Sequence, residues 1–122
     1  MNADEITEKI IGAAFAVSNT LGAGFLEKVY ENALAYELRQ LGLKVEQQKA
    51  LKVHYKGVLV GEFVADLLVE DAVIVELKAV KTLDESHMAQ GLNYLHATGL
   101  KVCLLLNFGT SKVQVKRVVH GF

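Results

Sequence analysis

Hydrophobic side chains recur every three or four residues in three stretches of the chain, which is the spacing of a helix with one buried face. The first stretch covers residues 3–20, and Asn2 followed by Glu5 has the spacing of a capped helix start. The second covers residues 25–41 and the third residues 85–98. A glycine follows each stretch, as is typical of helix ends. The pattern therefore predicts three amphipathic helices.

Between and after these helices the pattern changes to that of strands. Residues 44–55 have strand composition, and residues 58–80 predict strands around an acidic turn at residues 70–71. Residues 101–108 form an apolar run, typical of a central strand covered on both faces, and residues 113–119 alternate as a last strand. The order is helix, helix, three or four strands, helix, one or two strands. It predicts a mixed α/β sheet with helices on its faces.

Composition narrows the class of protein. A chain of 122 residues with 52% hydrophobic and 22% charged residues fits one folded domain, residues 1–122, and not a disordered tail. A net charge of −1 argues against binding nucleic acid by bulk charge alone. One cysteine excludes an internal disulfide framework, and the polar, acidic N-terminus does not resemble a signal peptide. We therefore expect a soluble, cytoplasmic protein without membrane association.

Three charged residues interrupt the most apolar part of the chain. Asp66, Glu76 and Lys78 lie within residues 63–80, which are otherwise apolar on both faces of an extended strand. Burying an unpaired ion costs several kcal/mol, so these side chains must pair, reach water or hold a metal. Glu76 and Lys78 share one strand face. Asp66 joins them only if the turn has an odd number of residues or a bulge, because a two-residue turn places it opposite Val75.

Two interpretations of this cluster remain open from the residues alone. Two neighbouring carboxylates repel each other, and Mg²⁺ or Mn²⁺ prefers such hard oxygen ligands. A lysine beside them is suited to orient a water or to stabilise developing negative charge. The alternative is a structural ion pair of Asp66, Glu76 and Lys78 at the end of a sheet.

Several blocks of the sequence resemble a known family. The spacing D-x₉-E-L-K, after G-x-G-F-L-E-x-x-Y at residues 22–30, resembles the PD-(D/E)XK nuclease superfamily, and more narrowly the small GxxExxY proteins. The resemblance continues through residues 65–70, 75–80, 89–95 and 104–109. It implies a restriction-endonuclease-like α-β-β-β-α-β core with an extra N-terminal helix. It also implies a metal-dependent phosphodiesterase site.

The resemblance also implies roles for individual residues. Asp66 and Glu76 correspond to the ligands of Mg²⁺ or Mn²⁺, with the carbonyl of Leu77 as a third. Lys78 corresponds to the residue that orients the attacking water or stabilises charge. Glu27 on the second helix would complete the site, directly or through a metal-bound water.

Two helices carry further candidate residues. On the third predicted helix, Gln90 four residues before Tyr94 resembles the QxxxY element of exonuclease-type relatives. His87, Gln90 and Tyr94 form a polar stripe that faces either the site or solvent. On the second, Glu27 lies at the margin of the apolar face, whereas Glu37 lies more centrally and belongs to no motif.

The resemblance implies a Mg²⁺- or Mn²⁺-dependent nuclease, and it favours DNA over RNA as the nucleic acid. The alternative hypothesis is a nuclease-fold module that binds nucleic acid or serves in an assembly without turnover. The apolar content of so small a chain is compatible with a homodimer.

Overall fold

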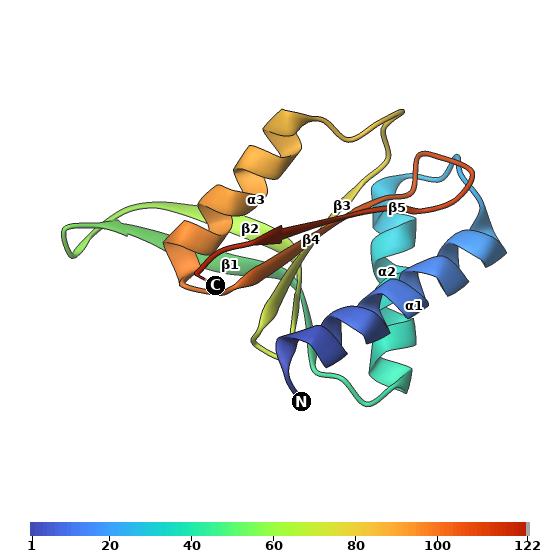
Figure 1. Cartoon of the computed structure of the whole chain (residues 1–122), viewed down its shortest axis with the longest axis horizontal. Coiled ribbons are helices and arrows are strands. Elements are labelled where there is room, and N and C mark those ends of the chain that lie inside the picture. Colours follow the sequence, from blue (N-terminus) through green and yellow to red (C-terminus); the bar gives the residue numbers. More distant parts are fainter. Residues whose placement is uncertain (122) are drawn as a thin grey trace.

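The computed structural model describes residues 1–121 as a five-stranded sheet with helices on both faces (Figure 1). All three predicted helices and the predicted strand regions are present, and their ends agree with the sequence pattern to within two residues. In chain order the elements are α1 (Ala3–Leu21), α2 (Glu27–Gln40), β1 (Val45–Tyr55), β2 (Val58–Val69), β3 (Val73–Lys78), α3 (Glu85–Thr98), β4 (Val102–Asn107) and β5 (Gln114–Val119).

The strands lie side by side in the order β1-β2-β3-β4-β5. Neighbours are antiparallel except β3 and β4, which are parallel because α3 carries the chain back across the sheet. β4 is buried along its whole length, which confirms the prediction of a central strand. This arrangement confirms the predicted mixed sheet.

Two hydrophobic cores form where the helices pack on the sheet, one on each face. α1 and α2 cover one face, where they pack on the alternate side chains of β3 and β4, including Val75 and Leu104. α3 covers the opposite face, where Leu95 packs with Ile74 and Leu105. Figure 1 shows α3 on one side of the strands and the α1–α2 pair on the other. β3, which carries Glu76 and Lys78, therefore lies between the two layers.

The turn between β2 and β3 sets the register on which the site depends. Val69 pairs with Val73, so the turn contains the three residues 70–72. Both Glu70 and Asp71 adopt positive φ angles, of 54° and 53°. If the pairing of β2 with β3 is continued from Val69 and Val73 by three residues along each strand, Asp66 lies opposite Glu76. The odd-length turn that the sequence required is therefore present.

Tyr30 ties the loop between α1 and α2 to the rest of the protein. Its hydroxyl donates to the carbonyl of Gly22 at 2.6 Å and accepts from the N–H of Phe25 at 3.1 Å. Its ring stacks on Phe108, just after β4, at 4.7 Å between centroids. The tyrosine of the G-x-x-E-x-x-Y motif is thus a fully buried structural residue.

Asn107 and Gly109 fix the segment that follows Lys78. The buried amide of Asn107 donates to the carbonyl of Val80 at 2.9 Å and accepts from the N–H of Val80 at 3.0 Å. Gly109 lies so close that a Cβ there would sit 2.5 Å from the backbone nitrogen of Val80. The backbone beyond the end of β3 is therefore held against the backbone beyond β4.

Among residues 1–121, the structure contains no helix with the length and apolar character that crossing a membrane requires.

Substituting Gly109 tests this close approach. In Gly109→Ala the added methyl group must displace the backbone of Val80, so we expect a loss of about 1–3 kcal/mol in the free energy of unfolding. Gly12→Ala is the matched control, because nothing lies near the added methyl group on α1 and alanine favours a helix. Urea denaturation measures both variants. A Gly109→Ala protein as stable as the wild type would contradict the close contact.

Candidate active site

Asp66 and Glu76 meet where β2 and β3 lie side by side. The backbone N–H of Asp66 donates to Oε2 of Glu76 at 3.4 Å. The backbone N–H of Leu77 donates to Oδ2 of Asp66 at 2.8 Å. Glu76 is 5% exposed, whereas Asp66 is half-buried. The two strand acids that the sequence singled out therefore form one pair.

The environment of this pair changes the acidity of Glu76. The pKa of Glu76 is raised from 4.5 to about 8, chiefly by burial and then by the hydrogen bond and the negative charge of Asp66. The positive charge of Lys78 acts in the opposite direction, with a smaller effect on this pKa. Two carboxyl groups thus share a site that disfavours a second negative charge.

Lys78 and Leu77 complete the strand part of the candidate site. Lys78 lies two residues beyond Glu76 on the same strand face. Its positive charge lowers the pKa of Glu76, against the larger effect of burial. The carbonyl of Lys78 accepts from the N–H of Phe108 at 2.8 Å, which fixes this end of β3. The N–H and C=O of a strand residue point to the same side, so the carbonyl of Leu77 faces the strand that carries Asp66.

The acid of α2 that joins this group is Glu31 and not Glu27. Glu27 is the first residue of α2; its side chain is exposed and forms no hydrogen bond or ion pair with any residue of the described part of the chain. Glu31, one helical turn further, is 3% exposed. Gln48 connects it to the pair, since Nε2 of Gln48 donates to Glu31 at 2.6 Å and to Asp66 at 3.3 Å.

The sequence contained a signal for Glu31 that the motif obscured. Glu31, Leu34 and Leu38 lie at i, i+3 and i+7 on the buried face of α2. The expected Glu27 lies on the same stripe but is the first residue of α2, where its side chain is exposed. No comparable signal existed for Gln48, because its role depends on a backbone conformation in the middle of a strand.

The polar stripe of α3 divides into residues with different surroundings. The ring of Tyr94 stacks on Phe63 at 3.9 Å, and its pKa is raised to about 12 by burial and then by the charges of Glu76, Cys103 and Asp66. Tyr94 therefore lies in the electric field of the carboxyl pair.

In the described part of the chain, the other two residues of this stripe have no hydrogen bond to the carboxyl pair. Gln90 is exposed, and its side chain has no hydrogen-bond partner in the described chain. Nδ1 of His87 accepts from the N–H of Asp84 at 3.1 Å, so this ring closes the N-terminus of α3.

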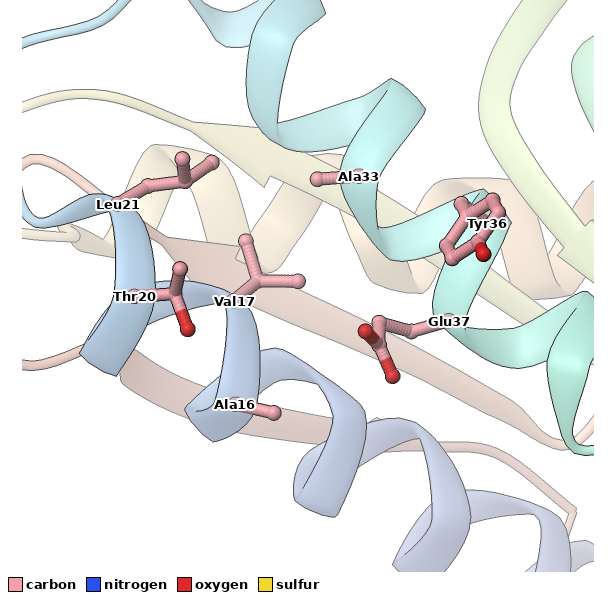
Figure 2. Close-up of a pocket in the computed structure, with 7 residues that line it drawn as sticks. All are labelled: Ala16, Val17, Thr20, Leu21, Ala33, Tyr36 and Glu37. Carbon is pink, nitrogen blue, oxygen red and sulfur yellow. The ribbon is translucent and has the colours of Figure 1, made fainter.

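Glu37, the acid that no motif explains, lies away from the pair. It lines a cavity of about 190 Å³ between α1 and α2, together with apolar residues that include Val17 and Leu21. Figure 2 shows the Glu37 side chain extending from α2 toward α1. None of the candidate site residues lines this cavity, so the cavity is separate from the carboxyl pair.

Comparison with known families identifies the superfamily of the chain. The model of the PD-(D/E)XK nuclease superfamily matches residues 4–118, which cover all five strands and all three helices except the first residue of α1 and the last residue of β5. The chain belongs to the PD-(D/E)XK nuclease superfamily. No curated protein matches the chain at a significant level.

Two solved structures are similar in fold to this chain, at low sequence identity. An alkaline exonuclease (LHK-Exo) from Laribacter hongkongensis is similar with a TM-score of 0.56 and 14% identity over 77% of the chain. The structure of SSO0001 is similar with a TM-score of 0.61 and 14% identity over 98% of the chain. The chain spans 56% of the exonuclease chain and 60% of the SSO0001 chain.

PD-(D/E)XK nucleases generally use divalent metals, and the donors of the pair fit such an ion. Within residues 1–121 no three acidic, histidine or cysteine side chains gather closely enough to form a ligand cluster by themselves. Mg²⁺, however, keeps several waters and is commonly bound through one or two carboxylates and substrate phosphates. Asp66 and Glu76 are two neighbouring carboxyl groups in a site that disfavours a second negative charge, and such a pair fits that smaller set of ligands.

The raised pKa of Glu76 predicts how stability depends on pH. Between pH 4.5 and about 8 the folded protein keeps a proton on Glu76 that the unfolded chain releases. The stabilisation is thus complete below pH 4.5 and is lost as the pH rises to about 8, by on the order of a few kcal/mol. Urea denaturation in the presence of a chelator measures this loss. Glu76→Gln lacks the ionisable group, so a wild type with the same pH slope as Glu76→Gln would contradict the prediction.

Proposed function

We propose that this protein is a Mg²⁺- or Mn²⁺-dependent nuclease that hydrolyses phosphodiester bonds in DNA. The observation that carries the proposal is the pair of half-buried Asp66 and buried Glu76 with Lys78 on the same strand face as Glu76. Membership of the superfamily supports a nuclease function. The choice of DNA over RNA, and of the GxxExxY proteins as the narrower group, rests on the sequence resemblance of the G-x-x-E-x-x-Y and E-L-K blocks.

In this proposal each residue has a defined task. Asp66 and Glu76 hold the cation. The carbonyl of Leu77 faces β2, the strand that carries Asp66. A bound divalent cation supplies Lewis-acid polarisation of the phosphate and increases the acidity of a bound water. Lys78 holds the attacking water or stabilises the negative charge that develops on the phosphate. Tyr94 would contact the substrate beside the carboxyl pair; after burial, the charges of Glu76 and Asp66 raise the pKa of Tyr94, and this supports the role.

Substituting Lys78 tests the catalytic part of the proposal. We expect Lys78→Ala to lower the rate of Mn²⁺-dependent digestion of labelled DNA by about 10²- to 10³-fold, because it removes a charge that acts on the developing transition state. Mn²⁺ binding, measured by calorimetry, should remain. Asp66→Asn should abolish both the digestion of DNA and the binding of Mn²⁺. Lys9→Ala, at an exposed position of α1, is the matched lysine control and should cleave like the wild type.

Two results would contradict this catalytic proposal in different ways. Equal residual activity in the wild type and in Lys78→Ala would point to a contaminating nuclease. A wild type that binds Mn²⁺ and DNA without cleaving the DNA would instead support a nuclease-fold binding module.

A second comparison identifies the helix acid that serves the site. We expect Glu31→Gln to weaken Mn²⁺ binding by about 10- to 100-fold, because Glu31 is linked through Gln48 to Asp66. Glu27→Gln, one turn away on an exposed position, should bind Mn²⁺ like the wild type. Calorimetric titration of both variants measures this difference. The reverse order of effects would restore Glu27 to the role that the motif implies.

A further inference from the structure

Gln48 interrupts β1 at the position where this strand passes Asp66. Gln47 pairs with Leu67, and Lys49 pairs with Ala65, but Gln48 and Asp66 between them do not pair. The φ angle of Gln48 is 51°, in the left-handed region that glycine favours and glutamine rarely adopts. The register is the same on both sides of this position, so the interruption is local.

The unusual backbone directs the side chain of Gln48 between two acids. Nε2 donates to Oε1 of Glu31 at 2.6 Å and to Oδ1 of Asp66 at 3.3 Å. Because both partners are carboxyl groups, which accept hydrogen bonds when ionised, the amide nitrogen and not the amide oxygen must face them. The two hydrogens of one NH₂ group thus serve one acid on α2 and one acid on β2.

The remaining contacts show which acid depends on Gln48. Glu31 has other donors, since Lys28 reaches both of its oxygens at 3.0 Å and Nε2 of Gln47 reaches Oε2 at 2.7 Å. Within residues 1–121 the carboxyl oxygens of Asp66 accept from two donors, the N–H of Leu77 on Oδ2 and Nε2 of Gln48 on Oδ1, and the carboxyl group of Glu76 also lies beside them. Gln48 is therefore the side-chain donor that reaches the second carboxyl oxygen of Asp66.

We propose that Gln48 is a positioning residue of the candidate metal site. Its left-handed backbone places one amide group so that it aligns the carboxyl group of Asp66 and links it to Glu31 on α2. This inference rests on the proposed function for the identity of the bound ion. Strained backbone conformations persist where the surroundings enforce them, and they concentrate at functional sites.

Gln47 offers a matched comparison for this role. It also bridges α2 and β1, through Glu31, Asn32 and Arg39, but it does not contact Asp66. A purely structural role of the two glutamines predicts that substituting either one lowers stability in a similar way. A positioning role of Gln48 predicts that metal affinity depends on Gln48 alone.

The test combines thermal unfolding with Mn²⁺ titration of the full chain. Gln48→Gly removes the amide but suits the positive φ angle, so we expect an unchanged or higher Tm together with at least tenfold weaker Mn²⁺ binding. Gln47→Ala should lower Tm and bind Mn²⁺ like the wild type. Wild-type affinity in Gln48→Gly would overturn the proposal, as would a loss of affinity in both variants that parallels their loss of Tm.

Side-chain amide NMR separates this inference from the proposed function. In spectra recorded without metal, we expect the Nε2 resonances of Gln48 to shift in Asp66→Asn, while those of Gln47 stay in place. Unchanged Gln48 resonances would overturn the orienting contact. A wild type that binds no Mn²⁺ would contradict the proposed function, and the NMR result would still decide whether Gln48 orients Asp66.

Discussion

The candidate site depends on two carboxyl groups that the fold brings together, one of them buried and the other half-buried. A three-residue turn between β2 and β3 sets the register that places Asp66 opposite Glu76. The helical layers on both faces of the sheet bury β3, and this burial is the main reason that the pKa of Glu76 is raised to about 8. A site with these properties disfavours two negative charges and favours either a proton or a cation.

The structure around this pair holds the end of β3 from several directions. Asn107 and Gly109 fix the backbone of Val80, so the strand that carries Glu76 and Lys78 ends in a defined place. α3 contributes Tyr94, which lies in the field of the pair and stacks on Phe63. The sequence blocks that resemble the family thus include residues, such as Asn107 and Gly109, that fix the backbone around the candidate site.

The contribution of α2 differs from the one that its motif implies. Tyr30 of the motif is a buried structural residue, and Glu27 is exposed, whereas Glu31 beside the motif reaches the strand acids through Gln48. An amide between two acids provides a donor to each, and it keeps them near one another without adding charge. The site therefore extends across three elements, β2, β3 and α2, with β1 as the connection.

The sequence by itself determined the elements and the central pair of the site. Helix and strand periodicity located every element, and the cost of burying ions singled out Asp66, Glu76 and Lys78 within apolar strands. Tertiary structure decided the rest. The length of the β2–β3 turn depends on two positive φ angles, and the link from Glu31 to Asp66 depends on a third, at Gln48. The angle at Gln48 accompanies side-chain contacts with α2 and β2, which are distant in sequence, and residue periodicity carries no record of such contacts.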